Sequence, residues 1–149
     1  MKCTIITNES LYTGSHNRNW IAGRLCKPGS DFQRRLIAGE AIDGFIAIVE
    51  DFGEMIGWAR TEPWAEPDVE ARAAGFPTAM LHWNTLEAFV VQDYRGRGIA
   101  TFAAAGLRAV SFLDDPTAAV FSPSMMLLAK KVGLMPTLFR EQAEEWVRA

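Results

Sequence analysis

The segment VVQDYRGRGIA, residues 90–100, has the residue types and spacing of an anion-binding turn. An apolar pair is followed by two arginines that alternate with two glycines, and an alanine-rich stretch comes next. Glycine lets the backbone approach a ligand closely, and a helix that begins here leaves its first N–H groups without acceptors. Arg95 and Arg97 can add bidentate bonds to phosphate. The segment therefore predicts a pyrophosphate site on the amides of residues 96–101; the alternative is a solvated charged turn without a ligand.

The sequence on either side of this turn predicts a strand and a helix. Residues 81–91 are apolar on both faces, which is typical of a central strand that is covered on both sides. After the turn, apolar residues recur at helical spacing until Asp114, Asp115 and Pro116 end the helix. The predicted stripe consists of Ile99, Phe102, Ala103, Gly106, Leu107, Val110 and Leu113. A strand, a turn and a helix in this order suit a phosphate site.

A β-hairpin is predicted in the middle of the chain. Apolar residues 45–49 and 55–60 flank a turn at Asp51, Phe52 and Gly53. The DFG triplet is also found in protein kinases, but the other kinase motifs are missing, so we interpret it as a turn. Residues 61–78, with three prolines and several acidic residues, are predicted to form a long connection of the kind that often binds ligands.

The N-terminal part is predicted to contain one strand and two helices. The strand covers residues 2–6, and the first helix carries Trp20, Ile21 and Leu25. A second, short helix starts at a capping box formed by Ser30 and Gln33 and stops at Gly39.

The C-terminal part is predicted to contain a short strand at residues 117–121 and a helix that follows it. Ser122 caps this helix, Pro123 occupies its first turn, and Gly133 ends it. A further strand up to Phe139 and a final helix from Glu141 complete the prediction.

Size, charge and composition restrict the class of protein. A chain of 149 residues with 49% hydrophobic side chains is expected to form one domain, residues 1–149. A net charge of −3 disfavours nucleic acid and anionic lipid as partners, and no apolar run reaches the roughly 20 residues of a membrane span. Cys3 and Cys26 lack metal-type spacing, and no signal peptide is apparent, so we expect a cytoplasmic protein without a metal site.

These motifs resemble those of the GNAT superfamily of N-acetyltransferases. The family signature is Gln or Arg, two residues, Gly, one residue, then Gly or Ala, which corresponds here to Arg95, Gly98 and Ala100. Val90 stands where the family commonly has the valine that ends its fourth strand. The segment GFIAIVEDFGEMIGWAR is similar to the second and third strands of the family, and FSPSMMLLAKKVGL is similar to its fifth strand and following helix.

The resemblance implies a fold and a cofactor. The implied fold is an α+β domain with a mixed, mostly antiparallel, splayed sheet of about six strands and helices on both faces. The implied cofactor is acetyl-coenzyme A, with its pyrophosphate on the turn and its pantetheine on the backbone of strand four. The cofactor residues that follow are Val90, Val91, Arg95, Gly96, Arg97, Gly98, Ile99, Ala100 and Thr101, with Ser122 at the position where the family commonly has asparagine.

Two residues are candidates for the general base in acetyl transfer. Glu87 lies in an otherwise apolar strand, and burial there would raise its pKa toward a value useful for a base. The alternative is that Glu87 reaches solvent or pairs with an arginine. His82, at the start of the strand, is the second candidate. The tyrosine that protonates the departing thiolate in the family is replaced by Ala129; Ser122, Ser124 or Tyr94 could substitute, and so could water.

The function implied by the resemblance is the transfer of an acetyl group to a primary amine, either a protein lysine or N-terminus or a small amine. Trp58, Trp64 and Trp83 could line an acceptor groove or cap the core. One alternative is a catalytically silent coenzyme A-binding module, which the alanine at position 129 favours. Another is an acetyltransferase toxin that acts on tRNA, which the acidic balance disfavours. The short segment after Gly133 also leaves room for a homodimer that completes the sheet.

Overall fold

The predicted hairpin forms the centre of an antiparallel sheet in the computed structural model, which describes residues 1–8 and 18–137. The sheet consists of β1 (Lys2–Ile6), β2 (Phe45–Asp51), β3 (Glu54–Thr61) and β6 (Glu87–Val90), in the order β1-β2-β3-β6. Phe52 and Gly53 have φ values of 50° and 77°, as the two-residue type I′ hairpin turn requires. The hairpin and its turn are therefore confirmed.

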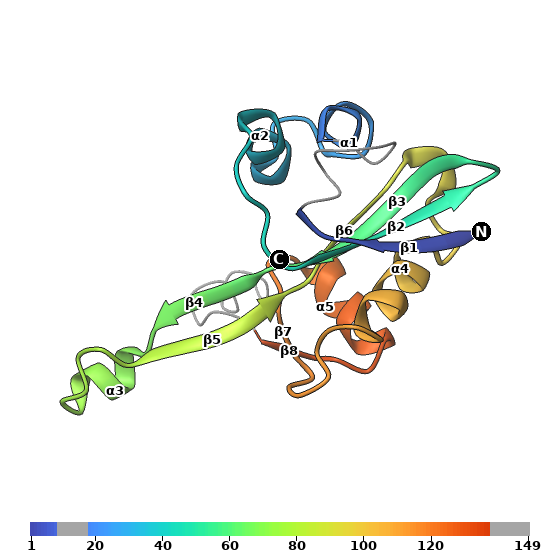
Figure 1. Cartoon of the computed structure of the whole chain (residues 1–149). Helices are drawn as coiled ribbons and strands as arrows, with labels where there is room; N and C mark the ends of the chain where they lie inside the picture. The colour runs from blue at the N-terminus through green and yellow to red at the C-terminus, as the bar shows by residue number, and fades with distance from the viewer. Residues whose placement is uncertain (9–17, 138–149) are drawn as a thin grey trace.

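Helices cover both faces of this first sheet (Figure 1). On one face, α1 (Arg18–Arg24) and α2 (Asp31–Ala38) pack their apolar residues against Ile46, Ile48 and Trp58. On the other face, α4 (Ile99–Arg108) packs against Ala47, Val49, Ile56 and Ala59. The even and odd residues of β2 thus enter two separate cores, as the two-residue period of a strand dictates, whereas in β3 the alternation changes phase at the irregularity opposite Val49 and Glu50.

A second sheet joins the C-terminal part of the chain to the middle. It consists of β4 (Pro63–Pro67), β5 (Met80–Thr85), β7 (Thr117–Ala119) and β8 (Met135–Thr137), in that order. The β4–β5 pair is antiparallel, whereas β5–β7 and β7–β8 are parallel. Helix α5 (Pro123–Lys131) connects β7 to β8. The chain is therefore α+β with helices on both faces of the first sheet, but the predicted single sheet of about six strands is replaced by two four-stranded sheets.

A single long ribbon links the two sheets. β3 runs into β4, β5 runs into β6, and the register is unchanged across the break: Arg60 lies opposite Glu87, and three residues further on Pro63 lies opposite Asn84. At the break, Thr85 N–H donates to the carbonyl of Glu62 at 2.9 Å, and Glu62 N–H donates to Thr85 Oγ1 at 3.1 Å. The strand predicted at residues 81–91 is therefore two strands separated by Leu86.

The two sheets separate at Leu86. Its N–H donates to the carbonyl of Ala119 at 3.0 Å, and β7 ends at Ala119. Beyond this point β6 pairs with β3 on one side, and among the described residues no strand pairs with its other side. One edge of β6 is therefore open within the described residues.

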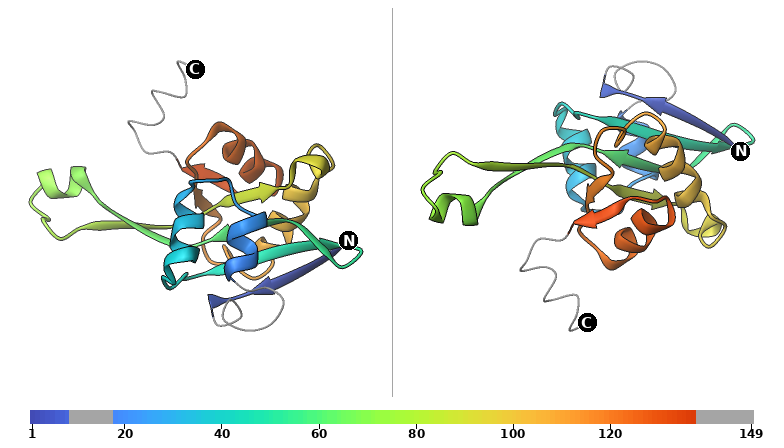
Figure 2. Two further views of the ribbon diagram at one scale, coloured as in Figure 1. Left: turned by 90° about the horizontal axis from the view of Figure 1, so that it is seen from above. Right: turned by 90° about the horizontal axis from the view of Figure 1, so that it is seen from below.

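Residues 61–78 do not form the predicted loop. They contain β4 and the short helix α3 (Val69–Ala73), and with β5 they make an arm that projects from the body of the molecule (Figures 1 and 2). The strand β4 was not predicted because it begins and ends with proline. Proline cannot donate a hydrogen bond to a β-ladder, so its presence normally argues against a strand. None of the residues of α3 is buried.

Most predicted helix ends are confirmed. Ser30 Oγ accepts from Gln33 N–H at 3.2 Å, and Ser122 Oγ accepts from Met125 N–H at 3.2 Å, so both N-caps are present. Gly39 and Gly133 have φ values of 75°, and each adopts the left-handed conformation just after its helix. Helix α4, in contrast, ends at Arg108, before the predicted stop. Val110 and Leu113 are consequently exposed instead of lying on its buried stripe.

The remaining predictions for the termini lie partly outside the described residues. Strand β1 is confirmed, and β8 occupies the start of the strand predicted after Gly133. The predicted end of that strand at Phe139 and the helix from Glu141 lie outside the described range. In the described part of the chain, no helix combines the length and the apolar composition needed to cross a bilayer.

Candidate functional site

The turn after β6 presents a helix N-terminus with open space around it. Residues Gln92–Tyr94 form a 3-10 turn, and Gly98 is the N-cap of α4. Gly96 and Gly98 have φ values of 81° and 77°, and a Cβ placed on either glycine would meet nothing within 4 Å. The N–H groups of the first turn of α4 have no acceptors within the helix, so this end attracts anions.

Both arginines of the turn lie over aromatic rings. The guanidinium of Arg95 lies 5.7 Å from the ring centre of Phe89, and its Nε donates to the carbonyl of Val90 at 2.9 Å. The guanidinium of Arg97 lies 5.1 Å from the ring centre of Tyr94. Both side chains are exposed, so their positive charge remains available to a ligand at the turn.

A groove of about 440 Å³ runs from this turn to α5. The turn and the start of α4 form one end, and β6 forms one wall. The groove residues are Ala88, Phe89, Val90, Tyr94, Arg95, Gly96, Gly98, Ile99, Ala100, Thr101, Ser124, Met125, Leu127, Leu128 and Lys131. The structure thus brings most of the predicted cofactor residues together around one cavity.

The open edge of β6 supplies backbone hydrogen-bonding groups to this groove. In an antiparallel ladder, alternate residues direct N–H and C=O to opposite sides. Val91 N–H donates to Ile56 of β3 at 3.0 Å, whereas Leu86 N–H donates to Ala119 of β7. Ala88 and Val90, which alternate with Leu86, therefore direct their backbone groups away from β3. The carbonyl of Val91 also accepts from Tyr94 N–H at 3.0 Å, so both backbone groups of Val91 are already engaged.

A second cavity, of about 430 Å³, adjoins the groove on the α2 side of β6. The two cavities share Ala88, Phe89, Ser124 and Met125. The second cavity also includes Lys27, Ser30, Asp31, Phe32, Trp58, Leu86, Glu87, Phe121 and Ser122, and we refer to it as the aromatic pocket. A ligand in the groove and a ligand in the aromatic pocket would meet at β6.

Glu87 lies in the aromatic pocket and is paired with an arginine. Arg60 Nε and Nη2 both lie 2.9 Å from Glu87 Oε2. The Arg60 side chain is 4% exposed, and its guanidinium lies 4.1 Å from the ring centre of Phe32. The prediction that Glu87 is a buried acid is therefore wrong: its side chain is 38% exposed and pairs with an arginine, as in the alternative.

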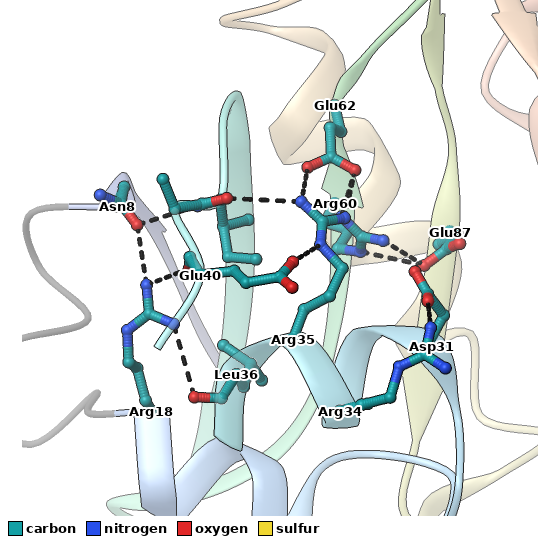
Figure 3. A network of polar contacts seen from close by, with 12 residues as sticks. Asn8, Arg18, Asp31, Arg34, Arg35, Leu36, Glu40, Arg60, Glu62 and Glu87 are labelled. Atoms are coloured by element: carbon teal, nitrogen blue, oxygen red, sulfur yellow. Dashed lines mark hydrogen bonds and ion pairs between the residues drawn. The ribbon is translucent and has the colours of Figure 1, made fainter. Parts of the chain in front are cut away.

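The ion pair is part of a larger polar network at the base of the arm (Figure 3). Glu62 accepts from Arg35 Nη1 and Nη2, both at 2.6 Å, and from Arg60 Nη1 at 3.4 Å. Burial raises the pKa of Glu62, but the hydrogen bonds from Arg35 and the charge of Arg60 outweigh it and hold that pKa below its usual value. The network therefore keeps Arg60 in place beneath the pocket.

The remaining candidates divide between the cavities. Tyr94 and Ser124 line the groove, whereas Ser122 lines only the aromatic pocket, and its Oγ is used in the cap of α5. Ala129 is fully buried, so its position does not face the groove. His82 lies on the arm in a separate cavity with Trp64 and Trp83, and the structure does not bring it to β6.

Sequence reasoning missed several residues of the site. Arg60, Phe32, Phe121 and Lys131 were not singled out, although a buried arginine opposite Glu87 could have been found from the hairpin register. Of the three tryptophans considered for an acceptor groove, Trp58 lines the aromatic pocket. Within the described ranges, no cluster of His, Cys, Asp and Glu side chains could hold a metal ion.

Comparison with known proteins adds no assignment. A scan against protein-family models finds no match to the chain. A search of curated proteins also finds no match.

Proposed function

We propose that the protein is a GNAT-type N-acetyltransferase that binds acetyl-coenzyme A in the groove and a primary amine in the aromatic pocket. The observation that supports this most directly is the position of the α4 N-terminus, with its two left-handed glycines, at the end of a groove that opens where two sheets separate. Ligands of α/β sheets commonly bind where neighbouring strands diverge and a helix begins.

The groove fits the parts of coenzyme A. The first N–H groups of α4, with Arg95 and Arg97, suit a pyrophosphate, and the exposed Lys131 adds positive charge along the groove. The backbone groups of Ala88 and the N–H of Val90 suit an extended chain of amides, which can pair with β6 as a short strand would. This role falls to Ala88 instead of Val91, because the backbone groups of Val91 are already bonded within the chain.

Acetyl-coenzyme A would supply a thioester, so that the neutral amine forms a C–N bond to the acyl carbon, the C–S bond breaks, and the nitrogen loses one proton while the departing sulfur gains one, which leaves an amide and a thiol. Glu87, on the pocket side of β6, would hold the ammonium and accept its first proton. Tyr94 or Ser124, whose side chains line the groove, would donate to the departing sulfur. Position 129 supplies no proton donor, because its residue is a buried alanine. A silent binding module is therefore the second candidate.

Calorimetric titration of acetyl-coenzyme A tests the proposed cofactor site. The variant Arg95→Ala/Arg97→Ala should bind at least about 100-fold more weakly than wild type, because charge-assisted bonds contribute roughly 1.5 kcal/mol or more each. Arg72→Ala, which removes an exposed arginine from the arm, is the control and should bind normally. Failure of the wild type to bind would overturn the proposal.

Thiol release with a panel of amines then separates an enzyme from a silent module. Turnover that depends on both the amine and acetyl-coenzyme A would identify an acetyltransferase. Binding of coenzyme A without turnover on any amine would favour the silent module.

A further inference from the structure

The walls of the aromatic pocket are made from side chains of both halves of the molecule. Phe32 and Trp58 meet edge to face with ring centres 4.9 Å apart, and Trp58 and Phe89 stack at 6.3 Å with an interplanar angle of 24°. These rings come from α2, β3 and β6, whereas Phe121 comes from the connection between β7 and α5. The pocket therefore lies between a continuous aromatic wall and a ring that follows the second sheet.

The polar groups behind this wall are already satisfied. Trp58 Nε1 donates to the carbonyl of Leu25, and Arg60 is bonded to Glu87 and Glu62. The three rings consequently line the pocket with apolar atoms, and Phe89 is more exposed than Phe32 and Trp58, which are almost fully buried. A flat apolar group, such as a second aromatic ring, is the ligand that such a surface binds best.

Glu87 adds one charged acceptor to this apolar surface. Arg60 binds only Oε2 of the carboxylate, and no residue in the described ranges binds Oε1. The side chain is 38% exposed and belongs to the lining of the pocket. Oε1 is therefore in a position to accept a hydrogen bond from a ligand, and its negative charge selects a cation.

We infer that the acceptor is a small primary amine carried on an aromatic body, with its ammonium on Glu87 Oε1 and its ring against Phe32, Trp58 and Phe89. This inference rests on the proposed function and names the class of amine. A cavity of about 430 Å³ accommodates a small molecule, and its aromatic lining suits a ring better than the aliphatic chain of a lysine. The exposed Lys27 at the same pocket would pair with a carboxylate on the ligand, as an aromatic amino acid carries.

Direct binding of amines, measured by calorimetry with and without saturating coenzyme A, tests the inference without any turnover. We expect 2-phenylethylamine to bind in at least one condition. We expect 2-phenylethanol, which lacks the cation, and n-propylamine, which lacks the ring, to bind at least about tenfold more weakly. Equal binding of the three compounds, or no binding of 2-phenylethylamine in either condition, would overturn the inference.

Two matched variants locate the ammonium. Glu87→Gln keeps the shape of the side chain. It should weaken the binding of 2-phenylethylamine about tenfold and leave the binding of 2-phenylethanol unchanged. Glu40→Gln removes an exposed carboxylate that pairs with Arg35 and touches neither Arg60 nor the pocket, so it should leave amine binding as in the wild type. An equal loss in both variants would contradict a direct contact with Glu87.

Further titrations distinguish the two sources of the amine and separate the inference from the proposed function. If phenylalanine binds more tightly than 2-phenylethylamine, and Lys27→Gln removes this preference, the acceptor is an aromatic amino acid. If 2-phenylethylamine binds more tightly, the acceptor is a simple arylalkylamine. Both outcomes support the proposed class of amine. If the protein binds coenzyme A but binds no aromatic amine, this inference alone is overturned. If the protein binds the aromatic amine but does not bind coenzyme A, the proposed function alone is overturned.

Discussion

The backbone of single residues decides whether the turn after β6 can bind an anion. Gly98 holds φ at 77°, where a residue with a Cβ is disfavoured by roughly 1–2 kcal/mol. The same conformation directs the first N–H groups of α4 into the groove. A substitution that strains the backbone at position 98 should therefore also reduce anion binding.

Gly98→Ala and Gly39→Ala form a matched pair that tests this point. Both glycines have φ values near 75° and no neighbour within 4 Å of an added Cβ, so both variants should lose a similar amount of stability. Gly98→Ala should also weaken the binding of acetyl-coenzyme A by about tenfold, because the turn shifts and a methyl group enters the anion site. Thermal unfolding and calorimetric titration measure the two effects. Equal affinity in both variants would contradict the assignment of the turn.

Cys26 provides a prediction for alkaline pH. Burial raises the pKa of its thiol to about 11; the charge of Arg60 opposes this rise and that of Glu87 adds to it. In the unfolded chain the thiol ionises near its ordinary value of 9.0, so the unfolded state loses this proton first as the pH rises. The contribution to stability is thus complete below pH 9 and is lost between pH 9 and 11.

Urea unfolding at pH 8 and pH 10.5 measures this contribution. Wild type should lose more stability between the two pH values than Cys26→Ala, which has no thiol to ionise. The cavity that alanine leaves affects both pH values alike, so it cancels in the comparison. Parallel losses in the two proteins would contradict the prediction.

Residue types predicted part of the site but not its pairing. Glu87 stood out from the sequence as a charged residue in an apolar strand, and Arg60 is the same kind of exception in β3. The two were not connected, because the residues between them were expected to form a loop instead of a continuous ribbon. Once the register is known, Arg60 lies directly opposite Glu87.

At the scale of elements, a charged pair fastens α2 to the ribbon. The Arg35 guanidinium binds both carboxylate oxygens of Glu62 at 2.6 Å, and Glu62 lies between β3 and β4. Because this pairing holds the pKa of Glu62 below its ordinary value of 4.5, the unfolded state takes up the proton first as the pH falls. Stability from this pair is present above about pH 4.5 and is lost below it.

Glu62→Gln should therefore flatten the acid limb of the stability profile. The variant is expected to be less stable than wild type at pH 7, with the difference shrinking as the pH falls toward 3. Glu70→Gln, an exposed position on α3, is the control and should follow wild type throughout. Chemical denaturation at several pH values gives both profiles, and a constant difference would contradict the role of the ion pair.

Elements with strong local signals were predictable, and those that depend on distant contacts were not. The hairpin turn at Phe52 and Gly53 and the caps at Ser30 and Ser122 are encoded within a few residues. The two sheets separate at Leu86 because β7 ends at Ala119. This separation cannot be predicted from the residues near Leu86. Helix α4 also ends before the predicted stop, and of the apolar residues after Arg108 Phe112 enters the core whereas Val110 and Leu113 are exposed.

At the scale of the whole molecule, the tip of the arm is an extension, whereas its base packs on the body: β5 pairs with β7, and Trp64 meets Phe121 edge to face at 5.3 Å. β4 and β5 are mostly exposed, and α3 buries no residue. Several large apolar side chains are exposed there, among them Val69, Phe76, Met80 and Leu81. The groove and the aromatic pocket lie at the other end of the ribbon, and none of these four residues lines either cavity.

Replacing residues 67–80 by Asn-Gly tests the independence of the tip of the arm. Glu66 lies opposite Leu81, and the hydrogen bonds of the ladder put these two residues in a hydrogen-bonded pair, so a two-residue type I′ turn can close the hairpin in its present register. The melting temperature should stay the same or rise, because closing a shorter loop costs less entropy, and titration with acetyl-coenzyme A should be unchanged. Light scattering before and after the replacement shows whether the arm also joins two copies. A marked fall in melting temperature would show that the body depends on the tip.

The unchanged register of the ribbon also bears on the order of folding. When the tip closes and β4 pairs with β5, β3 and β6 are already aligned, so zippering can continue without a second search for register. Trp58 then meets Phe89, and Arg60 meets Glu87, before any contact with the distant C-terminal strands is required. Two rings of the aromatic wall, Trp58 and Phe89, are thus brought together by contacts local to a single hairpin, whereas Phe32 from α2 and Phe121, which follows β7, come from distant parts of the chain.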